Sequence, residues 1–141
     1  MRGGPRRTVS LEEILAASNG PAVEEGMRAM LVFSAGGRLY AVDAAAVERV
    51  TESRFVAPLP SPPRGLLGVA TVTGRMRLVV DPAAGGGPAE PRRNFVVLHG
   101  DAQLALSADR VCAVVTVPEG EPARYEDREA ETLDPERLVD L

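Results

Sequence analysis

Short runs of apolar residues, separated by glycine-containing turns, characterise the chain from residue 30 to residue 117. The runs at 31–33 and 39–42 flank the pair Gly36-Gly37, which predicts a β-hairpin with a glycine turn. Large side chains recur at every second position in both runs, so each strand is expected to present them on one face. The pattern therefore begins with an antiparallel ribbon that has one apolar side.

A second glycine-punctuated pair follows at 66–72 and 75–80, with a turn at Thr73-Gly74. Alternation in the run 75–80 divides its side chains between two faces. One face is expected to carry Met76, Leu78 and Val80, and the other Arg75 and Arg77.

Further short strands are predicted at 54–57, 95–98, 104–106 and 111–117. Prolines in the run 58–63 cannot donate to a central ladder, so this run is expected to be an edge or a connection. Asp43 is placed to cap a single helical turn over 44–47. Many short strands with little helix predict an all-β fold of small barrels or a sandwich.

The two ends of the chain differ from this middle. Ser10 and Glu13 fit a capping box before a two-turn amphipathic helix, which could dock on its own domain or on a partner. Asp134-Pro135 is typical of the start of a helix. We expect a flexible tail with the short helix (1–28), a first half (29–82), a linker (83–92), a second half (93–117), an acidic loop (118–132) and a closing helix (133–141).

Charge and composition narrow the function classes. The 141 residues carry a net charge of −4, all 16 cationic side chains are Arg, and the acids concentrate near the end of the chain. A near-neutral body with an acidic end argues against nucleic-acid binding. No apolar run is long enough to cross a bilayer, and Glu12 and Glu13 interrupt what would be the apolar part of a signal peptide. We therefore expect a cytoplasmic protein without membrane insertion.

Candidate chemistry is sparse. Cys112 is the single cysteine, so it has no disulfide partner within the chain, and it is expected to be a buried structural thiol. His99 is the single histidine, which leaves zinc without a ligand set. The glycines at 85–87 lack the lysine of a phosphate-binding loop. The sequence predicts no catalytic residue, no metal and no cofactor.

The order of the strands and their glycines resembles CheW-like domains. The resemblance covers residues 30–117 and about the last nine residues. Its first part is carried by Leu31-Val32-Phe33, Gly37, Tyr40-Ala41-Val42, Val47, Val50, Leu59-Pro60, Gly65, Gly68-Val69, Gly74 and Val79-Val80-Asp81. Its second part is carried by Gly100, Leu104-Ala105-Leu106, Asp109-Arg110-Val111, Val114 and the closing run 133–138.

This resemblance implies two small SH3-like β-barrel halves and a non-catalytic adaptor that couples chemoreceptor cytoplasmic regions to a histidine kinase. It places the partner-binding surface at Val47, Arg49 and Val50, with Gly68 near the kinase contact and Val72 and Thr73 in the next turn. Val47 and Val50 could equally be core residues, and Gly68 could simply permit a tight bend.

Two departures from the family suggest an abbreviated member. Thr73 stands where the family commonly carries Arg, and Arg49 stands where some relatives carry an acid, so partner choice is expected to change. The acidic segment 118–132 is expected not to form strands, which would leave the second barrel half incomplete and open to another CheW-like chain. Such short adaptors serve myxobacterial gliding motility and would bind receptors without recruiting the kinase.

Two alternatives remain open from the sequence. The first is a full coupling protein that bridges receptor and kinase. The second is a small-molecule sensor, for which Arg75, Arg77 and His99 are the candidate ligand-binding residues.

Overall fold

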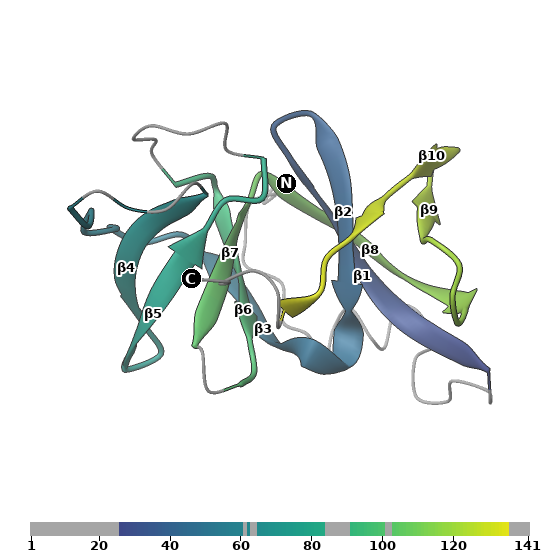
Figure 1. Ribbon diagram of the computed structural model, residues 1–141, viewed down its shortest axis with the longest axis horizontal. Helices are drawn as coiled ribbons and strands as arrows, with labels where there is room; N and C mark the ends of the chain where they lie inside the picture. The colour runs from purple at the N-terminus through teal and green to yellow at the C-terminus, as the bar shows by residue number, and fades with distance from the viewer. Residues whose placement is uncertain (1–25, 61, 63–64, 84–90, 101–102, 136–141) are drawn as a thin grey trace, which may run out of the picture.

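The computed structural model describes residues 26–60, 62, 65–83, 91–100 and 103–135, which form two main β-sheets (Figure 1). The four-stranded sheet has the order β11-β2-β1-β8. Its strands are β1 (Met27–Ala35), β2 (Arg38–Asp43), β8 (Arg110–Pro118) and β11 (Glu131–Thr132). β1 is antiparallel to β2 and β8, whereas β11 runs parallel to β2.

The five-stranded sheet has the order β3-β6-β7-β5-β4. Its strands are β3 (Val47–Glu52), β4 (Leu66–Val72), β5 (Arg75–Val80), β6 (Asn94–Leu98) and β7 (Leu104–Ala108). β5 and β7 pair in parallel, and the other neighbours are antiparallel. The predicted all-β fold is confirmed.

The local signals in the first half are confirmed. The hairpin β1–β2 turns at Gly36 and Gly37, both at positive φ, and β4–β5 turns at Thr73 and Gly74. The Asp43 carboxylate accepts a hydrogen bond of 2.9 Å from the amide of Ala45 and caps a single 3₁₀ turn, η1 (Ala44–Ala46). This turn carries the chain from the four-stranded sheet into the five-stranded sheet.

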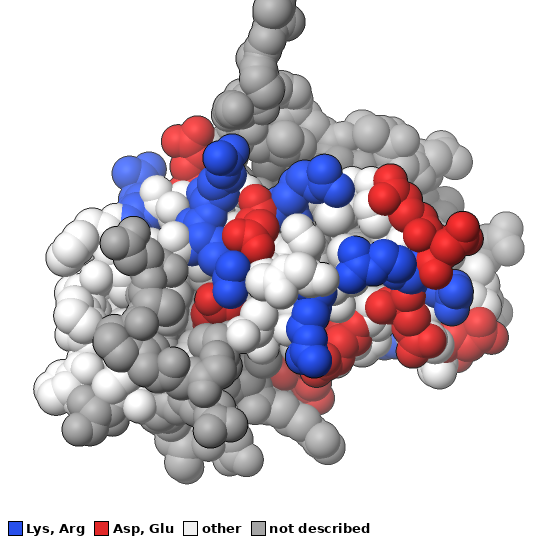
Figure 2. Space-filling view, turned by 90° about the horizontal axis from the view of Figure 1, so that it is seen from above, with Lys and Arg blue, Asp and Glu red and all other residues white. Residues whose placement is uncertain are grey.

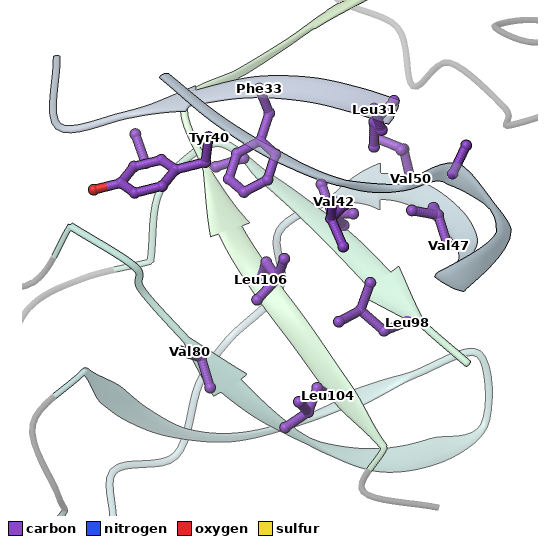
Figure 3. Packing of buried hydrophobic residues seen from close by; sticks show 14 of the residues in the cluster. Leu31, Phe33, Tyr40, Val42, Val47, Val50, Val80, Leu98, Leu104 and Leu106 are labelled. Atoms are coloured by element: carbon purple, nitrogen blue, oxygen red, sulfur yellow. The ribbon is translucent and has the colours of Figure 1, made fainter. Parts of the chain in front are cut away.

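The main core lies between the two sheets (Figure 3). The alternating large residues of β1 and β2 meet there, with the Phe33 and Tyr40 rings stacked at a centroid distance of 5.8 Å. A second cluster lies within the five-stranded sheet and is built from Leu67, Ala70, Val72, Val79, Phe95, Val97 and Ala105. A third lies on the other face of β1 and β2 and is built from Met30, Val32, Leu39, Ala41, Ala123 and Ala130.

The expectation that 118–132 cannot form strands is wrong. This segment forms β9 (Arg124–Tyr125), β10 (Arg128–Glu129) and β11 (Glu131–Thr132). Two small side chains, Ala123 and Ala130, are 0% and 1% exposed and anchor it, and the partly buried Tyr125 packs against the same cluster. A backbone hydrogen bond of 2.8 Å from Ala130 to Ala123 joins the two alanines. These few apolar contacts and the backbone pairing hold an otherwise charged segment against the sheet.

The contiguous halves 29–82 and 93–117 are not the structural units. β1 and β2 belong with β8 and β11 from the far end of the chain, whereas β3, β4 and β5 pair within a sheet that includes β6 and β7. The two structural units are therefore the two sheets, and each sheet combines strands from early and late parts of the chain. The expected linker lies mostly outside the described residues, as do the N-terminal helix and the closing helix after Pro135.

Two smaller expectations also change. The predicted strand 54–57 is reduced to one bridge between Ala57 and Val69, because the chain leaves the sheet after Glu52 and returns only at Ala57. Cys112 is partly exposed on β8 at the side of the third cluster, and so it is not a fully buried thiol. In the described part of the chain, no helix has the length and apolar character needed to span a membrane.

Candidate functional site

Three of the six predicted partner-binding residues are core residues. Val47 and Val50 are 1% and 4% exposed and pack between the sheets, where Figure 3 shows them among Leu98 and Val42. Val72 is 1% exposed and belongs to the cluster inside the five-stranded sheet. Of the two roles that the sequence left open for Val47 and Val50, burial favours the core.

Gly68 is required by a close backbone approach. It has φ +151°, and a Cβ atom at this position would lie 2.1 Å from the carbonyl oxygen of Ala57. The close approach of the two backbones allows a two-way bridge, in which the amide of Ala57 donates to Val69 at 2.8 Å and the amide of Val69 donates to Ala57 at 2.9 Å. Gly68 therefore allows the proline-rich connection to pair with β4. A tight bend alone would not require this close approach.

The other two predicted residues, Arg49 and Thr73, meet at one surface site. This polar depression has a volume of about 490 Å³ and lies at the end of the five-stranded sheet where β4 turns into β5, the lower end in Figure 1. Its lining also includes the three candidates of the small-molecule alternative. The lining residues are Glu48, Arg49, Thr73, Arg75, Arg77, His99, Gly100 and Gln103.

Arg77 forms the most buried part of this polar depression, at 4% exposed. Its guanidinium lies 3.4 Å from the Glu48 carboxylate, and the other carboxylate oxygen of Glu48 lies 4.0 Å from Nδ1 of His99. The sequence assigned Arg75 and Arg77 to one face of β5 but did not predict that Arg77 is buried. Arg77 shares a face with the core residue Val79, while Met76 is 64% exposed.

An apolar patch that the sequence did not predict lies on the other side of the β4–β5 hairpin. Phe55 and Met76 are 81% and 64% exposed and are the exposed large apolar side chains of the described chain. They border a groove of about 320 Å³ lined by Arg54, Phe55, Ala57, Val69, Ala70, Thr71 and Met76. The sequence signal that could have predicted this patch is a phenylalanine in a proline-rich connection, because no regular strand alternation directs its side chain into the core.

A cluster of charged residues around Arg92 ties the two sheets together. Arg92 pairs with Asp81 at 2.9 Å and with Asp109 at 3.2 Å, and Asp109 also accepts a bond of 2.8 Å from the amide of Gly36. Burial alone would lower the pKa of Arg92, but the two carboxylates outweigh it and raise the pKa. Arg92 thus stays cationic, and its role is structural.

Neither charge nor ligand spacing points to chemistry. Among the described residues, no three His, Cys, Asp or Glu side chains gather closely enough to hold a metal ion. On the face seen in Figure 2, acidic and basic side chains lie interspersed rather than in a single-sign field.

Comparison with known proteins agrees with this arrangement. The sequence matches the CheW-like domain family over residues 29–137. The fold is similar to that of the scaffolding protein TtCheW from Thermoanaerobacter tengcongensis, with a TM-score of 0.61, 18% sequence identity, and coverage of 81% of this chain and 86% of that one. No match was found among curated proteins. From the family match over most of its length and the shared fold, the chain belongs to the CheW-like domain family of non-catalytic chemotaxis scaffolds.

Proposed function

We propose that this protein is a cytoplasmic chemosensory adaptor that docks on the cytoplasmic region of a chemoreceptor without recruiting the histidine kinase. The observation that carries the proposal is the meeting of Arg49 and Thr73 in the polar depression. These are two positions at which the sequence departs from the family resemblance described above, and both line one surface site. Charge changes at an interface select against former partners as well as for new ones.

The exposed apolar patch supports a docking role of this kind. Large apolar side chains that stay exposed on a small domain are typical of protein contacts. Phe55 and Met76 supply apolar area on one side of the β4–β5 hairpin, and the polar depression supplies charge on the other. Together they give the hairpin an apolar and a polar contact surface, the two ingredients of an ordinary interface.

One observation favours the full coupling protein as a second candidate. Gly68, which the family packs near its kinase contact, is retained here together with the close approach of Ala57. The apolar patch includes Ala57 and Val69 from that same region. A kinase contact at this end of the molecule would use features that the chain has kept.

Co-purification separates the two candidates. The chain is mixed with a chemoreceptor cytoplasmic region and with the histidine kinase from the same cells, separately and together. Capture of the receptor alone supports the proposed adaptor, whereas a stable three-way assembly supports the coupling protein. Binding to neither would rule out both.

A gain-of-function variant sharpens this experiment. Arg49→Glu combined with Thr73→Arg restores family-type charges in the polar depression and is expected to add kinase binding. Its matched control is Arg38→Glu with Thr116→Arg, which makes the same two changes at exposed positions of β2 and β8. If the restored variant recruits no more kinase than the control, the polar depression does not decide kinase recruitment.

A further inference from the structure

Arg77 is a buried cation whose contacts with backbone carbonyls and with a carboxylate are long. Its Nε and Nη1 atoms donate to the carbonyl oxygens of Val72 and Leu98 at 3.4 and 3.5 Å. Its Nη2 atom donates to Glu48 at 3.4 Å and to the hydroxyl of Thr73 at 3.2 Å. Charge-assisted bonds to a carboxylate are ordinarily about 2.7–2.9 Å. The guanidinium is therefore held in place without a close anionic partner.

The rim of the polar depression adds to this positive charge. Arg49 and Arg75 are exposed, and neither has an ion-pair partner within the described ranges. Among the described residues, the lining thus carries three guanidinium groups and one carboxylate, that of Glu48. In a chain whose net charge is −4, this is a local field of the opposite sign.

The charges favour a carboxylate over a phosphate dianion. A guanidinium presents parallel N–H donors that match two oxygens of either group, so donor geometry does not choose between them. Glu48 remains in the polar depression and is 30% exposed, so a dianion would be repelled more strongly than a singly charged group. An incoming carboxylate could take up the donors of Arg77 that Glu48 approaches only at 3.4 Å.

The openness of the site favours a carboxylate that arrives on a protein. Arg49, Arg75 and His99 are all exposed, and single exposed ion pairs contribute only about 0–1 kcal/mol. A free small acid would gain little from them. A carboxylate on a partner that is also anchored by the apolar patch gains from a high effective concentration.

We propose that the polar depression binds acidic side chains of the partner, so that this adaptor selects an acidic docking segment. The inference rests on the proposed function in one respect, because the carboxylate that binds is taken to belong to a docked protein. Arg77 and the rim residues Arg49 and Arg75 hold the carboxylates, and Glu48 is the internal group that they displace.

A labelled hexaglutamate peptide tests this selection without a named partner. Its binding to the full chain is followed by fluorescence anisotropy at low and at moderate salt. We expect saturable binding that weakens with salt, and a loss of about tenfold or more in Arg49→Glu/Arg75→Glu. The control Arg38→Glu/Arg128→Glu makes the same charge change in β2 and β10 and should lose no more than about twofold.

Two further arms define the chemistry. Hexalysine should bind Arg49→Glu/Arg75→Glu more tightly than it binds the natural chain, because the reversed rim attracts cations. Acetate and inorganic phosphate should both compete weakly with hexaglutamate at equal ionic strength, and phosphate should compete no better than acetate. Equal losses in the two double variants, or stronger competition by phosphate, would overturn the proposal.

The outcome is separable from that of the proposed function. Receptor capture without hexaglutamate binding would leave the adaptor role and remove the acidic selection. Hexaglutamate binding at the polar depression without receptor capture would keep the carboxylate site and remove the receptor as its partner.

Discussion

Replacing Gly68 by alanine tests how the proline-rich connection is fastened to β4. A Cβ atom would lie 2.1 Å from the Ala57 carbonyl oxygen and 2.9 Å from a methyl group of Val56, so the connection must move away. That movement breaks the two bridge hydrogen bonds between Ala57 and Val69, at about 1 kcal/mol each. The positive φ adds about 1–2 kcal/mol of backbone strain.

The expected loss in unfolding free energy is therefore about 3–4 kcal/mol, which a domain of ordinary stability survives. Urea denaturation measures this loss. Gly37→Ala is the matched control, because Gly37 has φ +83° and nothing lies within 4 Å of its added Cβ atom. The control should lose only the strain, about 1–2 kcal/mol. Hydrogen exchange should also show lost protection at the Val69 amide.

Equal destabilisation by the two alanines would refute this account of Gly68. It would mean that the connection relaxes freely and that the bridge contributes nothing. Retained protection of the Val69 amide in Gly68→Ala would refute it independently.

Three further substitutions test the core, the charged cluster and the β4–β5 turn. Val47→Asp places a charge at a position that is 1% exposed and should cost more than about 4 kcal/mol, so circular dichroism is expected to show loss of the fold rather than a folded, binding-deficient protein. Arg92→Ala leaves the Asp81 carboxylate, 2% exposed, without its cation and should cost about 3 kcal/mol in urea unfolding, whereas the exposed neighbour in Arg93→Ala should cost under about 0.5 kcal/mol. Thr73 has φ +53°, a conformation that a β-branched residue adopts only with strain. Thr73→Asn should therefore raise the free energy of unfolding by about 0.5–1 kcal/mol, which thermal denaturation would show as a higher midpoint. A lowered midpoint would show that the Thr73 hydroxyl matters more than the strain.

The features that the sequence predicted well are those determined by neighbouring residues. Both glycine hairpins and the Asp43 cap depend on a few consecutive positions, and all three are found in the structure. Alternation predicted the face of β1 and β2 that packs between the sheets, but it did not predict that their other face is buried in the third cluster. Local pattern was sufficient for the hairpins β1–β2 and β4–β5, but it missed the consecutive pair β9–β10.

The features that it missed depend on what covers a strand from elsewhere. Met76 continues the alternation of Leu78, but it lies outside the main core against which Leu78 packs and borders the groove beside Phe55, so it stays exposed. Arg77 is buried because its face looks into the five-stranded sheet beside Val79. The polar depression is lined by residues of β3, the β4–β5 turn and the end of β6. No spacing in the sequence predicts that these segments lie together.

The mixing of early and late strands in both sheets has a consequence for how the protein comes to be folded. β1 leaves the ribosome well before its edge partner β8, which is not complete until Pro118 has been added. β3 likewise waits for β6. Pairings this distant in sequence close slowly, and an early hairpin with a free edge is prone to associate with other chains. Cutting the chain between 84 and 90 should give two pieces that fold only when mixed, since neither contains a whole sheet.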